Sequence, residues 1–228
     1  MKEKIYLIPG LMTDHRLWHR LEPHLNDYEL IHTPIPQSED FDEIVDFLHE
    51  NILCEKINLL GFSLGGYIAS YYAIKYPQKV NRLFLVGSTP SATEQKDVPR
   101  RKQKLQDARQ NQFTRLTLEK ARELLEQKED ESLAHIMVNM FNDLGHDHFV
   151  PQLASTLNRV DLYEHLTQLD VPIKFFYSTK DRLLNHSSIE NFIDKKHNIE
   201  FIPREGTSHN IPLEVPFDLS YEIKDWMN

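Results

Sequence analysis

The sequence feature that most constrains the fold is a Gly-x-Ser-x-Gly pentapeptide at Gly61–Gly65, between an apolar run and a helical pattern. The run Ile57–Leu60 predicts a buried strand, and the pattern Tyr67–Tyr76 predicts a helix. A strand that turns sharply into a helix holds the central serine, Ser63, in a strained backbone at the end of a sheet. The pentapeptide therefore predicts either an exposed nucleophile beside a helix N-terminus or a glycine-rich connector with an idle serine.

Length, charge and cysteine content limit the class of protein. The 228 residues suffice for one α/β domain, and no apolar run approaches the length of a membrane span. The formal net charge of −9 argues against general nucleic-acid binding. The single cysteine, Cys54, rules out an internal disulfide and suits a reducing compartment. We therefore expect a cytoplasmic protein that binds neither nucleic acid nor a membrane.

Apolar runs and helical spacings alternate along most of the chain. Besides the strand before Ser63, the predicted strands are Lys4–Ile8, Tyr28–His32, Val80–Val86, Ile173–Tyr177 and Ile199–Ile202. The predicted helices include His15–Leu25, Phe41–Ile52, Ser187–Lys196 and Leu213–Met227. Strands that alternate with helices predict an α/β fold, with a mostly parallel sheet and helices on both faces.

The stretch from 91 to 169 interrupts this alternation. It is polar, poor in glycine and helical in pattern, with no clear strand. We expect it to form a helical lid, inserted into a core made of residues 1–90 and 170–228.

Two residues that follow predicted strands complete the chemistry expected of a nucleophilic serine. A serine hydroxyl needs a base, and the base needs a third group to hold its tautomer. In sheets with this kind of turn the chain order is serine, acid, histidine, and Asp181 and His209 follow Ser63 in that order. Taken singly, they could be a loop aspartate that caps a turn and a solvent-exposed histidine. Asp170 is a second candidate for the acid, but it precedes its strand. In their expected order along the chain, Ser63, Asp181 and His209 together predict a catalytic triad.

The same chemistry needs backbone donors for a developing oxyanion. The expected donors are the N–H of Leu64, directly after the serine, and the N–H of Leu11, in the loop after the first strand. No cofactor is needed. The segment His146–His148 has no spacing known for a zinc site, so we expect no metal.

These features resemble the α/β-hydrolase fold family, in its small, helical-lid serine esterase form. Within that family, the sequence is similar to the group that contains the pimeloyl-carrier-protein methyl ester esterases and related bacterial hydrolases. It rests on Ile8-Pro9-Gly10-Leu11 with Trp18 downstream, Gly61–Gly66, Val80–Leu83, Asp161-Leu162 leading to Val171-Pro172, Asp181, and His209–Pro216. Members of the family often carry an extra N-terminal hairpin. Because only three residues precede the first predicted strand, we expect about six strands rather than eight.

Two departures from the family pattern concern the walls of the pocket. The usual His-Gly of the oxyanion loop is Pro9-Gly10 here, and the usual Gly-His-Gly after the second strand is replaced by Pro34–Gln37. The candidate substrate-binding residues are Trp18 and three lid residues, Phe113, Met140 and Phe141. The lid residues either line an apolar acyl pocket or form the core of the lid.

The early part of the lid is basic in an otherwise acidic chain. It carries Lys96, Arg100, Arg101, Lys102, Lys104, Arg109, Arg115, Lys120 and Arg122. This pattern predicts either a solvated helix face or an attraction for an acidic partner, such as a carrier protein.

The residues and the resemblance together predict a serine carboxylesterase that cleaves a small or acyl-chain carboxylic ester through an acyl-enzyme. Two alternatives stay open. One is a lyase or C–C hydrolase that uses the same triad, and the other is a non-catalytic ligand-binding protein that retains the fold.

Overall fold

A computed structural model describes residues 2–190 and 198–228, and these contain a six-stranded sheet in the order β2-β1-β3-β4-β5-β6. Each pair of neighbouring strands is parallel. The strands are β1 Lys4–Ile8, β2 Glu29–His32, β3 Ile57–Phe62, β4 Val80–Val86, β5 Ile173–Ser178 and β6 Ile199–Arg204. The predicted α/β class and strand number are confirmed.

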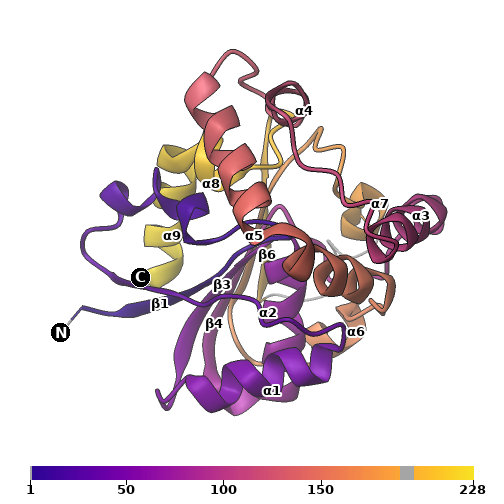
Figure 1. Ribbon diagram of the computed structural model, residues 1–228. Coiled ribbons are helices and arrows are strands. Elements are labelled where there is room, and N and C mark those ends of the chain that lie inside the picture. Colours follow the sequence, from indigo (N-terminus) through magenta and orange to yellow (C-terminus); the bar gives the residue numbers. More distant parts are fainter. Residues whose placement is uncertain (1, 191–197) are drawn as a thin grey trace.

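Helices cover both faces of the sheet (Figure 1). On one face lie α1 Phe41–Asn51, α2 Leu64–Lys75 and α6 Tyr163–Thr167, and α9 Pro216–Met227 lies on the other. Successive strand residues point to opposite faces, so Leu59 packs with α1 and α2 while Leu60 packs with α9. Strands buried on both faces explain the near-continuous apolar runs of the sequence.

The predicted helix His15–Leu25 is wrong. The chain instead forms two short 3₁₀ helices, η1 His15–Trp18 and η2 Glu22–His24. Asp14 caps η1 by accepting a hydrogen bond from the backbone of Arg16. Pro23 has no N–H to donate to a preceding turn, which prevents one continuous helix. A third 3₁₀ helix, η3 Pro77–Lys79, follows α2.

The C-terminal helices differ from the prediction in their bounds. The predicted helix Leu213–Met227 is divided into α8 Ile211–Glu214 and α9, and Pro216 begins α9, where a missing N–H costs nothing. Of the predicted helix Ser187–Lys196, the structure describes α7 His186–Glu190, and the remainder lies outside the described residues.

Between β4 and β5 the chain forms α3 Val98–Arg109, α4 Leu118–Glu123 and α5 Glu131–Leu157, followed by α6. We call residues 91–169 the lid segment, and its separation from the core as a unit stays a proposal. Its longest helix, α5, is kinked at Gly145, whose φ is 63°. Side chains from α3 and α5 pack together against Leu11, in the loop after β1. Nowhere in the described residues is a helix both long and apolar enough to cross a membrane.

The helix α2 lies so close to β3 and to the end of β1 that no side chain fits at Gly61 or Gly65. A Cβ on Gly65 would lie 2.2 Å from the carbonyl oxygen of Pro9 and 2.3 Å from that of Ile8. A Cβ on Gly61 would lie 2.3 Å from the carbonyl oxygen of Gly65. Backbone atoms cannot rotate away as side chains do, so the two glycines hold the turn around Ser63 in place.

We predict that Gly65→Ala lowers the free energy of unfolding by about 3 kcal/mol or more, because the new methyl group meets backbone oxygens that cannot yield. Gly145→Ala is the control, since a Cβ there meets no atom within 4 Å and adds only backbone strain. Urea denaturation of both variants checks this. An equal or smaller loss in Gly65→Ala would contradict the importance of the close approach.

Candidate active site

Ser63 lies in the sharp turn between β3 and α2, with a positive φ of 51° and a ψ of −114°. Several hydrogen bonds of its backbone hold it there. Its N–H donates to Val86 in β4 at 3.0 Å, and its carbonyl accepts from the Ser88 hydroxyl at 2.7 Å and from the Gly66 N–H at 3.1 Å. A backbone held this firmly can keep a conformation that costs about 1–3 kcal/mol, which is typical of functional sites.

His209 and Asp181 approach Ser63 from the carboxyl ends of β6 and β5. The Nε2 atom of His209 lies 3.0 Å from the Oγ of Ser63, and its Nδ1 lies 2.6 Å from the Oδ2 of Asp181. The other oxygen of Asp181 accepts the backbone N–H of Leu183 at 2.9 Å. The three predicted residues thus form one unbroken hydrogen-bonded chain.

The direction of the proton in this chain follows from the donors available. A carboxylate only accepts, so Nδ1 of His209 carries the proton and donates it to Asp181. In the neutral ring this leaves Nε2 as the acceptor for the Ser63 hydroxyl. The Asp181 side chain is fully buried and that of His209 is 13 % exposed, so water has little access to their hydrogen bond.

The backbone N–H groups of Leu11 and Leu64 have no hydrogen-bond partner among the described residues. Leu64 is the first residue of α2, where N–H groups have no acceptor inside the helix. Gly10 lies beside the serine, since a Cβ on it would come within 3.1 Å of the Ser63 Cβ. One unpartnered N–H thus belongs to Leu64, the residue after Ser63. The other belongs to Leu11, the residue after Gly10, which lies beside Ser63.

The loop that contains Leu11 is attached to the lid segment. Met12 has a positive φ of 56°, and its N–H donates to the Oε1 of Gln152 at 2.8 Å. Gln152 belongs to α5 and is only 3 % exposed. Thr13 adds a local contact, because its hydroxyl accepts the N–H of Gly10 at 2.8 Å. A buried lid side chain thus fixes the backbone next to Leu11.

The loop that carries His209 is attached to the lid segment as well. Glu126, between α4 and α5, accepts the backbone N–H groups of Thr207 and Ser208 at 2.6 and 2.7 Å. Arg204 at the end of β6 binds both oxygens of Glu126, at 3.1 and 3.0 Å. Those hydrogen bonds from Arg204 are the main reason that the pKa of Glu126 falls to about 2.

A second carboxylate, that of the buried residue Glu214 in α8, joins the same contact. It accepts the hydroxyl of Ser208 and the backbone N–H groups of Glu126 and Gln127, the last two at 2.7 and 2.9 Å. Burial raises the pKa of Glu214, although these hydrogen bonds favour the ionised form.

The family model described as the alpha/beta hydrolase fold matches residues 4–216. The chain belongs to this family. A pimeloyl-[acyl-carrier protein] methyl ester esterase from Aeromonas hydrophila is 26 % identical over 225 residues, covering 90 % of this chain and 87 % of that protein. Rat monoacylglycerol lipase ABHD6 is 25 % identical over 200 residues, covering 79 % of this chain and 58 % of that protein. The chain thus spans about three fifths of the lipase.

Solved structures agree on the fold of this α/β-hydrolase. A thermophilic esterase from Thermogutta terrifontis superposes with a TM-score of 0.85 at 18 % identity. The superposition covers all of this chain and 90 % of the esterase.

Two of the predicted substrate-binding residues of this α/β-hydrolase are buried. Trp18 and Met140 are each 1 % exposed and lie in the apolar cluster between the sheet, η1, α5 and α9. Phe113 and Phe141 are partly exposed and stack with ring centroids 5.7 Å apart, and Phe149 lies against both. Contact of Trp18, Phe113, Met140 and Phe141 with a substrate stays a prediction.

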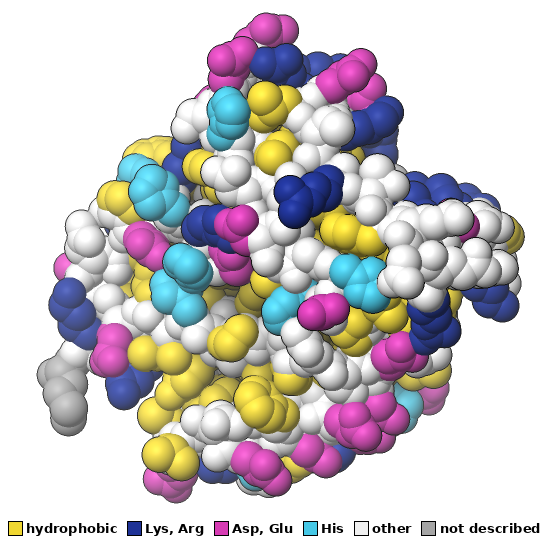
Figure 2. All heavy atoms as spheres, viewed as in Figure 1, with side chains coloured by type: hydrophobic (Ala, Val, Ile, Leu, Met, Phe, Trp, Pro, Cys, Tyr) yellow, Lys and Arg dark blue, Asp and Glu magenta, His cyan; other side chains and the backbone are white. Residues whose placement is uncertain are grey.

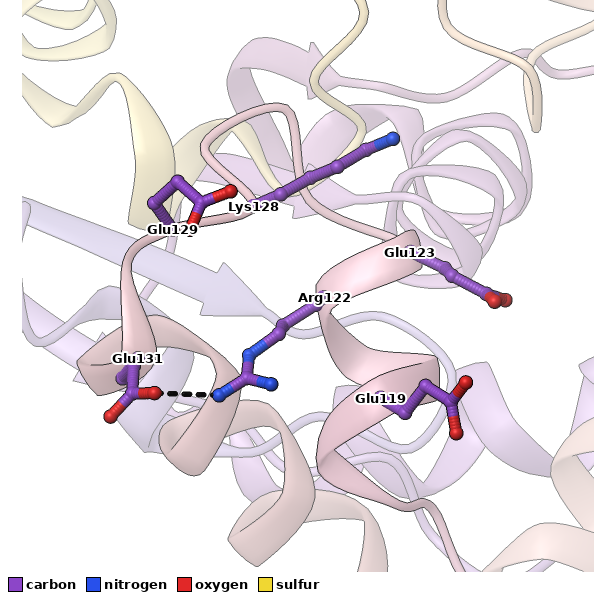
Figure 3. A pocket seen from close by; sticks show the side chains of 6 residues that line it. All are labelled: Glu119, Arg122, Glu123, Lys128, Glu129 and Glu131. Carbon is purple, nitrogen blue, oxygen red and sulfur yellow. Dashed lines mark hydrogen bonds and ion pairs between the residues drawn. The ribbon is translucent and has the colours of Figure 1, made fainter.

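A pocket of about 410 Å³ lies on the lid segment, at α4 and the start of α5 (Figure 3). Its lining is Glu119, Arg122, Glu123, Lys128, Glu129 and Glu131. Figure 3 shows Arg122 reaching Glu131, at 2.6 Å, while Glu119 and Glu123 point away from them. A lining of both charges is unlike the mostly apolar pockets that bind small molecules, and it contains none of the triad residues.

Three residues that support the site were not found from the sequence: Gln152, Glu126 and Glu214. Each acts through a partner that is distant in the sequence, and neither a glutamine in a helix nor a glutamate in a polar stretch stands out by its type. Only the position of Glu214 in the stretch after His209, which belongs to the family resemblance, carried any signal.

We predict that Glu126 stabilises the fold in a pH-dependent way. Its pKa is lower in the native state than the ordinary 4.5, so its contribution is complete above about pH 4.5 and is lost as the pH falls toward 2. In urea denaturation, wild type should therefore exceed Glu126→Gln in stability at neutral pH, and the gap should narrow in acid. A gap that is constant with pH would contradict the assignment.

Proposed function

We propose that this α/β-hydrolase is a serine carboxylesterase with Ser63 as nucleophile. The observation that carries the proposal is the hydrogen-bonded chain from the Ser63 hydroxyl through His209 to the buried Asp181. It lies at a turn with a strained backbone, next to two unpartnered N–H groups. A nucleophile, its base, an orienting acid and oxyanion donors are the parts that acyl transfer requires.

Each residue has one role in the proposed reaction. His209 takes the proton of Ser63 as the Ser63 oxygen attacks the ester carbonyl, and the N–H groups of Leu11 and Leu64 bind the oxyanion. His209 then gives the proton to the leaving alcohol. The alcohol departs, and an acyl-enzyme remains. The same base activates a water molecule, which releases the acid and restores the serine.

The names of the relatives support an ester substrate, since one is a methyl ester esterase and the other a lipase. We propose a small-molecule carboxylic ester, with no cofactor or metal. The other reactions considered for this triad, a lyase or C–C hydrolase, would act mainly on a carbon–carbon bond, so rates on simple esters and on such substrates must be compared. The third alternative, a non-catalytic ligand-binding protein, would convert none of these substrates. A cytoplasmic location also stays a proposal, based on the single cysteine.

We predict that Ser63→Ala lowers kcat for p-nitrophenyl acyl esters by about 10³-fold or more, because no other group supplies the nucleophile. The fold should persist, which circular dichroism and thermal melting check. Wild-type turnover in the variant would show that Ser63 is not the nucleophile.

Two aspartates provide the matched comparison for the acid. Asp181→Asn should lower kcat by about 10⁴-fold, because an amide at this position favours the wrong tautomer of the histidine. Asp170→Asn should change kcat little, since Asp170 precedes β5 and lies at the opposite edge of the sheet. The reverse order of sensitivity would assign the acid to Asp170.

The basic face of the lid segment supports a second, separate proposal about an acidic partner. Figure 2 shows Lys and Arg side chains gathered over α3, to the right of the view. Arg100 pairs with Asp97 and Arg109 with Glu39. Arg101 and Lys104 make no ion pair among the described residues, and burial lowers the pKa of each. We propose that this face attracts an acidic carrier or an anionic ester.

Attraction of this kind acts over about 8 Å at physiological ionic strength and mainly speeds encounter. We predict that changing Arg100, Arg101 and Lys104 to Glu lowers kcat/KM for a carrier-borne ester, most strongly at low salt. A neutral p-nitrophenyl ester serves as the control and should be hydrolysed at an unchanged rate. Equal losses on both substrates would indicate a structural role, and no loss on either would indicate a solvated face.

A further inference from the structure

We propose that Glu126 of the lid segment is a positioning residue for His209. The proposal rests on the proposed function, in which His209 is the base. It assigns to the lid segment a task inside the reaction: one of its carboxylates holds the loop that delivers the histidine. The loop is Glu205–Asn210, between β6 and α8, and it runs up to the end of α4 (Figure 1).

The carboxylate of Glu126 holds this loop by its backbone. Its Oε2 atom accepts the N–H groups of Thr207 and Ser208, the two residues that directly precede His209. Hydrogen bonds to a charged acceptor are roughly twice as strong as neutral ones, and two donors on one oxygen leave the peptide planes little freedom. The backbone position from which the His209 side chain departs is therefore set by a residue more than 80 positions earlier in the chain.

Arg204 fixes the direction of the Glu126 carboxylate. Its guanidinium binds both carboxylate oxygens, and its Nη1 lies 3.3 Å from the hydroxyl of Ser178 at the end of β5. The side chains of Arg204 and Glu126 are 16 % and 29 % exposed. A bidentate pair with this little exposure is directional, which a flexible surface pair is not.

The loop is built to admit this pair. Gly206 has a φ of 146°, and a Cβ on it would lie 2.2 Å from the Nη1 of Arg204 and 2.6 Å from the Oε2 of Glu126. Only a glycine at this position leaves room for the guanidinium and the carboxylate to meet beneath the loop. Ser208 is held on its other side as well, by its carbonyl to the hydroxyl of Ser178 at 2.6 Å and by its own hydroxyl to Glu214.

The geometry required of His209 makes this support relevant to rate. The imidazole must keep hydrogen-bond distance to both Ser63 and Asp181, and a shift of about 1 Å in a reacting group can cost about 10²-fold in rate. A positioning role thus predicts a loss in kcat with little change in KM, because the binding surface is left intact.

The decisive variant is Glu126→Gln, which keeps the shape of the side chain and removes its charge. If the amide oxygen faces Thr207 and Ser208, the NH₂ group faces the guanidinium of Arg204, donor against donor. We expect kcat on a p-nitrophenyl ester to fall between about 10-fold and 100-fold, with KM within about 2-fold of wild type. The matched control is Glu123→Gln, since the only ion pair of the Glu123 side chain among the described residues is with the exposed Lys120, and this variant should leave kcat unchanged.

A second readout does not depend on turnover. The proton that His209 donates to Asp181 gives a downfield N–H resonance in ¹H NMR, which should broaden or exchange faster in Glu126→Gln and stay sharp in Glu123→Gln. Arg204→Lys keeps the charge but loses the bidentate contact, and it should show the same change to a smaller degree. It also serves if Glu126→Gln does not fold.

A Glu126→Gln protein that is merely less heat-stable, with kcat and the resonance as in wild type, would overturn the proposal. So would an equal loss of kcat in Glu123→Gln. If wild-type protein hydrolyses no ester, the proposed function fails, and the comparison of the resonance still decides whether Glu126 positions His209.

Discussion

The site depends on the close approach of α2 to the loop after β1, where a Cβ on Gly65 would lie 2.2 Å from a backbone oxygen. Gly61 in β3 lies equally close to α2, where a Cβ would come within 2.3 Å of the Gly65 carbonyl oxygen. The chain turns from β3 into α2 at the single residue Ser63, which takes a positive φ. The same contact brings Gly10 beside Ser63. Without this turn, the hydrogen bond of His209 and the two unpartnered N–H groups would not be directed at the same serine.

The rest of the geometry comes from loops that the lid segment holds in place. Gln152 in α5 fixes the backbone of Met12, beside Leu11. Glu126 fixes the backbone ahead of His209. The lid segment is therefore hydrogen-bonded to the loops on both sides of Ser63. A large movement of residues 124–127 away from the core would break the hydrogen bonds of Thr207 and Ser208 to Glu126.

Most of the fold, and the three residues that the structure joins in a hydrogen-bonded chain at the candidate site, could be predicted from the sequence because they follow from local patterns. A strand buried on both faces reads as an apolar run, as in β3, and the paired glycines around Ser63 are typical of a strand that turns sharply into a helix. Asp181 and His209 could be placed because each directly follows a strand. The prediction of a helix over His15–Leu25 was wrong because the apolar spacing also fits two short 3₁₀ helices, which Asp14 and Pro23 favour.

The supporting residues lay beyond the reach of sequence patterns for a physical reason. Arg204 and Glu126 are 78 residues apart and meet only in the folded chain. Trp18 and Met140 show the converse limit: their type marks them as large apolar residues, but the sequence alone does not show that tertiary packing buries both. The spacing of apolar residues in a sequence shows that one face of a helix or strand is buried, but it does not show which partner buries that face.

Covalent capture of the nucleophile tests the central claim most directly. Wild-type protein would be treated with a fluorophosphonate, and the modified residue identified by mass spectrometry of its peptides. A nucleophile at the turn, activated by His209, predicts one phosphonyl group on Ser63, and little modification in His209→Ala. Modification of another residue, or ester hydrolysis that persists while Ser63 stays unmodified, would contradict it.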